Sequence, residues 1–323
     1  MKMTVRKVAE LADVSPASVS RALNGQDGIG EKTRKKILQV ISDTDYYPHK
    51  KSLRGGNIAL FMPQNCLYYQ HFFSHLQKIL RIFGQKWNLL LLPHDLSCNE
   101  FRRKCLQDKI EGVIIFGFSL SSPELEGIIN QMPHVWLNSH RLGGNDPNVL
   151  IGNEFAGKLA GRYLIGKGCK KCAIIDLPSQ NPGLYARCEG FRFECFSQKT
   201  ECKDLHFETP VLETLSHTEL ENIFISAAEE GLFKNFDGIF VPESFLLPSL
   251  HFALRSNDSL PLLVCGNNSP EHMAGIQPRP AAVDLGGDLL VELACQELFM
   301  LISGKKNTPE RSSFFISPKL CLP

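Results

Sequence analysis

The sequence predicts an α/β protein in which a small helical part precedes two runs of alternating strands and helices. Short apolar groups at helical spacing fill residues 4–44, a Gly-Gly pair follows at positions 55 and 56, and after Asn57 the apolar segments alternate between strand and helix length. At 323 residues the chain is long enough for two or three domains. We expect a head at 1–48, a linker at 49–56 and a larger domain at 57–323.

Two short helices joined by a tight turn are predicted at the N-terminus. The first helix ends at Asp13-Val14 and carries its apolar residues at helical spacing, namely Val5, Val8, Ala9 and Ala12. Ser15 is a favourable N-cap and Pro16 suits a first helical position, so a second helix begins there and runs towards Asn24. This arrangement is a helix-turn-helix.

The second helix is expected to turn a small, polar and cationic face outwards. Val19 and Leu23 are four residues apart and point inwards, which leaves on the outer face Ala17, Ser18, Arg21 and Ala22. A DNA major groove accepts such a helix, because Arg21 can contact guanine through two hydrogen bonds, Ser18 can bond to a base, and Ala17 can touch a thymine methyl. Three helices of an unrelated bundle with a solvated basic face are the alternative.

A third helix is predicted from Glu31 to Thr44, with Ile37, Leu38 and Ile41 on its core side. Its first turns hold Lys32, Thr33, Arg34, Lys35 and Lys36. Positive charge at a helix N-terminus opposes the macrodipole, so phosphate binding explains the cluster better than stability does. Residues 1–56 contain eleven Lys and Arg against six Asp and Glu, whereas the rest of the chain contains 24 against 28, so the positive charge is concentrated on the head.

These motifs resemble a known family. The pattern T-V-x-x-V-A-x-x-A-x-V-S-x-x-S-V-S-R-A-L-N-G, followed by E-K-T-R-x-K-I-L and Y-x-P, is similar to the N-terminal domain of the lactose-repressor (LacI/GalR) family of bacterial transcriptional regulators. The resemblance implies a homodimer whose paired heads read a pseudo-palindromic operator in double-stranded DNA. The residues expected to contact DNA are Thr4, Ser15, Ala17, Ser18, Arg21, Asn24, Lys32, Thr33, Arg34 and Leu53.

The linker after Pro48 reads HKKSLRGG and is rich in cations. In the resembled family this segment forms a short hinge helix on the operator, and a leucine from each subunit wedges into the minor groove. Leu53 is the candidate for that role. The segment is shorter than the usual family linker and lacks its N-x-x-A-R pattern, so a regulator that binds DNA independently of any ligand remains an alternative.

From Asn57 onwards the pattern is that of a doubly wound parallel sheet. Strands are expected at 58–62, 89–92, 112–116 and 135–137, and helices at 69–87, 99–108 and 123–131. The rhythm restarts after Asn153, with helices at 155–165, 185–197, 217–231, 245–256 and 288–303, and strands at 171–177, 237–241, 262–265 and 314–316. Two halves of one plan suggest a two-lobed sensor like a periplasmic sugar-binding protein, and the family resemblance implies the same fold.

Ligands of such sheets bind beyond the carboxyl ends of the strands. Several segments there resemble the family: GNEFAGKLA from Gly152, RCEGFR from Arg187, DGIFVPES from Asp237, LVCGNN from Leu263 and PRPAAVD from Pro278. The resemblance implies ligand-facing positions for Arg187, Glu243 and Asn267. Weaker candidates follow or begin cleft-side strand ends: Asn65, Tyr69, Phe118, Asn138 and Ser244.

The expected ligand is a small molecule, most simply a carbohydrate, with a purine or other non-sugar effector as the alternative. A guanidinium with five donors suits sugar hydroxyls or a carboxylate, whereas a surface ion pair with Glu189 or Glu194 is the other possibility for Arg187. Glu243 and Asn267 replace the family's usual Asn and Asp but still offer polar groups to a polyol.

Enzymatic and metal-binding functions find little support in the sequence. GRYLIGKG at Gly161 ends without the Ser or Thr of a phosphate-binding loop, and Cys169 and Cys172 form a C-x-x-C pair without further ligands nearby. No cofactor, metal or catalytic residue is therefore expected. The eleven cysteines are scattered, no secretory signal is apparent, and no apolar run approaches the ~18 residues of a membrane span, so we expect free thiols and a cytoplasmic protein.

Overall fold

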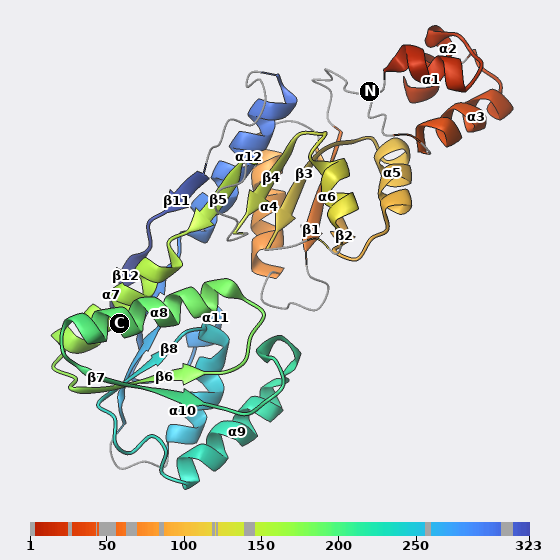
Figure 1. The fold of residues 1–323 in the computed structure, drawn as a ribbon. Coiled ribbons are helices and arrows are strands. Elements are labelled where there is room, and N and C mark those ends of the chain that lie inside the picture. The colour runs from red at the N-terminus through yellow and green to blue at the C-terminus, as the bar shows by residue number, and fades with distance from the viewer. Residues whose placement is uncertain are drawn as a thin grey trace. The chain divides into compact units, whose positions relative to one another are not determined.

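A computed structural model describes residues 4–24, 28–42, 44, 56–62, 70–83, 87–117, 120, 122–138, 146–255, 260–304 and 313–323 (Figure 1). The chain divides into two compact units. Unit 1 comprises Met1–Gln64, Tyr68–Val149 and Val291–Ser313, and unit 2 comprises Asn65–Leu67, Leu150–Leu290 and Phe314–Pro323. The chain therefore enters unit 2 within the strand Asn148–Ile151 and returns to unit 1 within the helix that begins at Gly287.

The head at the start of unit 1 contains three helices, α1 (Val5–Leu11), α2 (Pro16–Asn24) and α3 (Glu31–Ser42). They share a small core of Val8, Ala9, Ala12, Val19, Ala22, Ile37 and Ile41. The predicted helix-turn-helix is confirmed, but α3 ends at Ser42 instead of Thr44. Ala22 was expected on the outer face and is only 6% exposed, because it lies three residues after Val19 and so faces the same core.

The first sheet has the strand order β11-β5-β4-β3-β1-β2. Its strands are β1 (Asn57–Met62), β2 (Asn88–Pro93), β3 (Ile110–Phe116), β4 (His134–Leu137), β5 (Asn148–Ile151) and β11 (Ser313–Ile316). The pairs along β2-β1-β3-β4-β5 are parallel. The helices that accompany it are α4 (Gln70–Ile82), α5 (Cys98–Gln107), α6 (Pro123–Ile129) and the end of α12 (Gly287–Ile302).

The second sheet repeats this plan with the order β12-β10-β9-β8-β6-β7. Its strands are β6 (Lys171–Asp176), β7 (Glu201–His206), β8 (Gly238–Val241), β9 (Leu262–Cys265), β10 (Ala281–Asp284) and β12 (Lys319–Cys321). Only the β10–β12 pair among those described is antiparallel. The helical segments are α7 (Asn153–Gly166), α8 (Pro182–Ser197), η2 (Leu212–Thr214), α9 (His217–Glu229), η3 (Ser244–Leu246), α10 (Leu247–Leu254) and α11 (Pro270–Met273).

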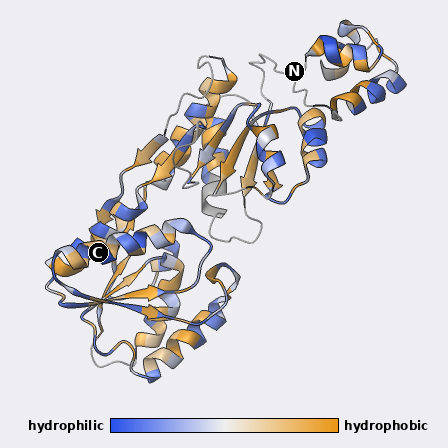
Figure 2. Cartoon of the chain, viewed as in Figure 1, coloured by the Kyte–Doolittle hydropathy of each residue, from blue (hydrophilic) through white to orange (hydrophobic). Residues whose placement is uncertain are grey.

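The sequence prediction missed several short or polar elements. β7 is the outermost strand of the second sheet and reads ECKDLH, so it lacks the run of apolar residues that identifies a buried strand. β5, β10, β12 and α11 were also not predicted, and the helix expected from Phe245 is divided into η3 and α10. The alternation of apolar strands and helices was nevertheless read correctly, and Figure 2 shows the central strands of both sheets mainly in hydrophobic colours.

None of the helices among the described residues is both long enough and apolar enough to cross a lipid bilayer.

Candidate functional site

The head presents part of α2 to solvent. Ala17 and Arg21 are exposed and Ser18 is half-buried. The Ser15 hydroxyl caps the helix, because it accepts a hydrogen bond from the Ser18 backbone N–H at 3.0 Å, and the two serine hydroxyl oxygens are 2.9 Å apart. Thr4 has the equivalent position at α1, where its hydroxyl accepts from the Lys7 backbone N–H at 3.3 Å. Both residues therefore shape the helix ends in addition to their expected place at the DNA.

The first turns of α3 expose Lys32 and leave Thr33 and Arg34 half-buried. Arg34 Nη1 donates to the backbone oxygen of Ala22 at 3.4 Å, so this side chain also ties α3 to the end of α2. A cation at a helix C-terminus is favourably placed against the dipole of that helix. Asn24 is the last residue of α2, and Leu53 lies outside the described residues.

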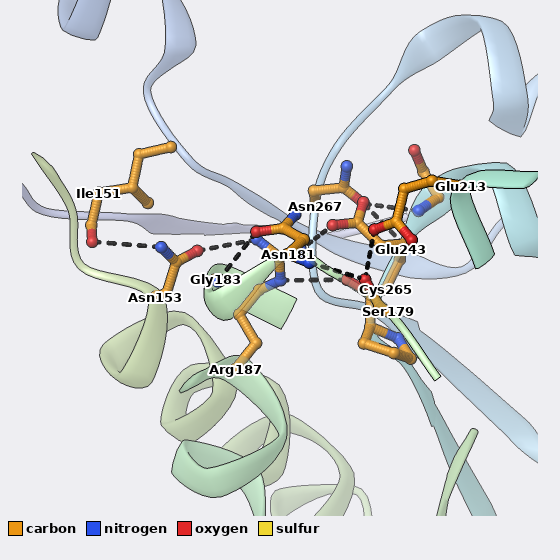
Figure 3. Close-up of polar contacts among 12 residues, drawn as sticks. Ile151, Asn153, Ser179, Asn181, Gly183, Arg187, Glu213, Glu243, Cys265 and Asn267 are labelled. Carbon is orange, nitrogen blue, oxygen red and sulfur yellow. Dashed lines mark hydrogen bonds and ion pairs between the residues drawn. The ribbon is translucent and has the colours of Figure 1, made fainter. Parts of the chain in front are cut away.

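Unit 2 carries a second group of functional candidates at the carboxyl ends of β6, β8 and β9. The order β7-β6-β8-β9-β10 reverses between β6 and β8, and a reversal of this kind is where doubly wound sheets bind ligands. Arg187 on α8 reaches the end of β8, as Figure 3 shows, and meets three residues from two other segments, the start of α7 and the residues that follow β8. The predicted ligand-facing residues Arg187, Glu243, Asn267 and Ser244 are all found at this edge.

The Arg187 guanidinium is held by protein groups on each of its nitrogens. Nε donates to the backbone oxygen of Pro242 at 3.1 Å, Nη1 donates to Asn153 Oδ1 at 2.8 Å, and Nη2 forms an ion pair with Glu243 Oε1 (Figure 3). Arg187 is 2% exposed and Glu243 is 1% exposed. The surface ion pair considered from the sequence is therefore wrong, since Glu189 pairs with Arg192 and Glu194 with Arg162.

Two glycines position Arg187 by allowing α7 and α8 to pack against each other without side chains. A Cβ at Gly157 would lie 1.9 Å from the backbone oxygen of Arg187, and a Cβ at Gly190 would lie 1.9 Å from that of Glu154. Both glycines belong to the segments GNEFAGKLA and RCEGFR that the family resemblance identified. The close approach places Asn153, at the start of α7, within reach of the guanidinium.

A second polar layer follows β9. Asn267 Oδ1 accepts from the Ser244 backbone N–H at 2.6 Å and from Cys265 Sγ at 3.6 Å, which fixes the direction of the carboxamide. Ser244 Oγ lies 2.9 Å from His272 Nδ1 and shares a hydrogen bond with it. Burial raises the pKa of Cys265 to about 12 and lowers the pKa of His272, so both groups are neutral at pH 7.

Sequence reasoning missed a third set of residues, which consists of the loop between β6 and α8 together with Glu213 of η2. The Glu213 carboxylate accepts from Ser179 Oγ at 2.6 Å and from the Gln180 backbone N–H at 3.1 and 3.2 Å (Figure 3). Asn181 Oδ1 accepts from the Gly183 N–H at 2.9 Å and caps α8. The Asn181-Pro182 pair was a readable helix-start signal, whereas the contact between Ser179 and Glu213 had no local signal.

The remaining candidates are not assembled with this group. Asn138 follows β4 in unit 1, has a φ of 52°, and its buried Oδ1 has no partner in the part of the chain that the structure describes. Asn65, Tyr69 and Phe118 lie outside the described residues.

Three sequence features could have indicated a phosphate-binding loop, a metal site or a redox pair. Gly161 and Gly166 both lie inside α7, so the first six residues of GRYLIGKG belong to a helix instead of a phosphate-binding loop. Within the described ranges no three His, Cys, Asp or Glu side chains gather as metal ligands. Cys169 and Cys172 are buried free thiols.

Known proteins resemble this chain both in its head and over most of its length. The model of "Bacterial regulatory proteins, lacI family" matches residues 4–49. The "Sucrose operon repressor" of Lactococcus lactis subsp. lactis is 26% identical over 306 residues, which are 92% of this chain and 92% of that protein.

Two solved structures cover almost the whole chain. A complex of the transcriptional regulator CelR with cellobiose has a TM-score of 0.63 at 19% identity and covers 99% of both chains. The lac repressor dimer bound to operator and the anti-inducer ONPF has a TM-score of 0.62 at 15% identity, covering 99% of this chain and 98% of that one. The helix-turn-helix head, the repeated parallel sheets and these likenesses lead to one conclusion: the chain carries the DNA-binding head of the lacI family of bacterial regulatory proteins, joined to a two-unit α/β fold that solved transcriptional regulators share.

Proposed function

We propose that this protein is a homodimeric, sequence-specific DNA-binding transcriptional regulator, acting in the cytoplasm as a repressor, whose affinity for its operator changes when a carbohydrate binds unit 2. The observation that carries the proposal is the head: residues 4–49 match the family model, and α2 exposes Ala17 and Arg21 while its other side is buried. A helix of this kind reads base edges in the major groove.

The DNA-facing roles divide into reading and holding. Arg21, Ser18 and Ala17 contact base edges, whereas Lys32, Thr33 and Arg34 at the start of α3 contact phosphates. Ser15, Thr4 and Asn24 lie at helix ends beside these groups, and Leu53 wedges into the minor groove at the centre of the operator. The positive charge of residues 1–56 supports this division, because phosphate contacts supply most of the non-specific affinity.

The effector is proposed to contact the polar edge of unit 2, which is the edge formed by the carboxyl ends of β6, β8 and β9. Arg187, Asn267 and Ser244 supply directional hydrogen-bonding groups there, and sugar hydroxyls both donate and accept. The relatives support a carbohydrate, since a sucrose operon repressor and a cellobiose-bound regulator are among the similar proteins. Binding shifts the population of two arrangements of the chain, and operator affinity follows that population.

The proposal is tested by titrating the purified full chain with operator DNA, selected from random sequence, in the presence and absence of sugars that raise its unfolding temperature. We expect at least one sugar to stabilise the protein and to change its operator affinity about fivefold or more, the usual range of allosteric coupling. Operator affinity that stays constant with every stabilising sugar would instead support a regulator that binds DNA without responding to ligand.

A further inference from the structure

Three charged side chains bond into the polar edge of unit 2, and two of them are acidic. The Arg187 guanidinium pairs with the Glu243 carboxylate, and the Glu213 carboxylate accepts from Ser179 and Gln180 (Figure 3). Glu243 follows β8, Ser179 follows β6, and these strands are hydrogen-bonded neighbours. The positive charge of Arg187 is thus already neutralised by the protein, and the group as a whole is formally negative.

Arg187 still has hydrogen-bonding capacity after these contacts. Among the residues that the structure describes, Pro242, Asn153 and Glu243 each accept one N–H, which uses three of the five N–H groups that a guanidinium offers. The two that remain can donate to neutral oxygens such as hydroxyls. They are poor partners for a second carboxylate, because that anion would have to approach Glu243 in a region where little water screens the repulsion.

The buried state of the pair makes this arrangement difficult to rearrange. Arg187 and Glu243 are 2% and 1% exposed, so an anion that displaced Glu243 from the guanidinium would leave its carboxylate buried without its charge partner. A neutral polyol avoids this cost, since it adds hydrogen bonds without removing the ion pair. Glu243 is thus placed to act on the choice of ligand through Arg187.

We propose that Glu243, supported by Glu213, restricts the effector of this protein to uncharged polyhydroxyl compounds and excludes sugar acids and sugar phosphates. This inference rests on the proposed function, because it concerns the ligand of the same edge of unit 2. It differs from that function in what it requires, since charge selection operates at ligand binding and does not depend on any change in operator affinity.

The experiment compares matched pairs of compounds that differ in charge: glucose with gluconate, galactose with galacturonate, and ribose with ribose 5-phosphate. Unfolding temperature and calorimetric binding are measured on the full chain for the wild type, Glu243→Gln, Glu213→Gln and the control Glu201→Gln. Glu201 is exposed at the amino end of β7, the opposite edge of the sheet. Glu213→Gln keeps the test usable if Glu243→Gln does not fold.

We expect the wild type and Glu201→Gln to bind the neutral member of at least one pair at least tenfold more tightly than its anionic partner. In Glu243→Gln this preference should fall at least tenfold, and in Glu213→Gln it should fall in the same direction. Anionic members that bind only the glutamine variants would support the proposal even if the wild type binds none of the compounds. Equal or tighter binding of an anionic member by the wild type would overturn it.

Two other results also decide the matter. If neither the wild type nor any variant binds a compound, the proposal is wrong, because removal of the carboxylate should admit the anions. If a neutral sugar binds selectively but leaves operator affinity unchanged, charge selection stands and only the proposed coupling to DNA fails.

Discussion

The Cα of Gly157 lies against the backbone carbonyl of Arg187, so closely that a methyl group on Gly157 would stand 1.9 Å from that oxygen. Gly190 meets the carbonyl of Glu154 at the same distance from the other side of the helix pair. The position of the Arg187 guanidinium therefore depends on the absence of two side chains. The two segments that resemble the family, GNEFAGKLA and RCEGFR, therefore meet at one crossing of α7 and α8.

Replacement of Gly157 by alanine should force α7 and α8 apart. Overpacking usually destabilises by about 1–3 kcal/mol, and the obstacle here is backbone, so we expect a loss at or above the upper end of that range. Chemical denaturation measures it. Gly166→Ala is the matched control on the same helix, because nothing lies within 4 Å of its Cβ position and alanine is the better helix former by up to about 1 kcal/mol. Equal effects of the two substitutions would contradict the close crossing.

The Arg187–Glu243 pair predicts a non-additive mutant cycle. Arg187→Met leaves a buried carboxylate without its charge partner and should cost about 3–5 kcal/mol of unfolding free energy. Adding Glu243→Leu should recover most of that loss, since apolar replacement of a whole buried pair is often neutral. Additive losses would mean that the two side chains do not interact as a buried pair.

The head predicts two different mutant phenotypes on DNA. Arg21→Ala should cost about 1–3 kcal/mol at the selected operator and relax base preference at one position, because it removes a base contact. Lys32→Ala should weaken all DNA alike and reduce the slope of log affinity against log salt by about one unit. Binding assays at several salt concentrations, on operator and on random DNA, distinguish them. Unchanged specificity in Arg21→Ala would show that α2 is not the reading helix in the way proposed.

The stability of unit 2 should fall on acidification. Burial lowers the pKa of His272 below its ordinary value of 6.5, so below that pH the unfolded chain binds the proton more readily than the folded protein. The contribution is complete above pH 6.5 and is lost as the pH falls through the lowered pKa of the folded state. Unfolding temperatures from pH 7.5 to 5 should decline less steeply in His272→Gln than in the wild type. Equal slopes in His272→Gln and the wild type would contradict a contribution from the burial of His272.

Much of the fold was readable because local patterns determine it. The Ser15-Pro16 pair predicts the start of α2, and the apolar composition of the buried strands predicts them in both sheets. Ala22 was wrongly placed on the outer face, although it lies three residues after Val19 and that spacing puts both residues on the buried side of α2. The outermost strand β7 has no run of apolar residues, so its pairing with β6 could be established only from the structure.

The candidate site was predictable in its members and not in its contacts. Arg187, Glu243, Asn267 and Ser244 were identified singly, through segments that resemble a family. That Arg187 and Glu243 neutralise each other, 56 residues apart in the chain, has no signature in either segment. Asn153 was overlooked for a related reason: its importance comes from the helix crossing, which brings it to a guanidinium on another element.

The return of the chain to unit 1 has a consequence for biosynthesis. Leu298 and Ile302 of α12 cover Gly112 of β3, and Phe299 packs near Trp87, yet α12 follows the whole of Leu150–Leu290 in the sequence. At about 5–20 residues per second, a ribosome takes on the order of ten seconds to make that stretch. For that time the nascent first sheet has one apolar face without its cover, which makes it a natural client for chaperones that shield hydrophobic surfaces.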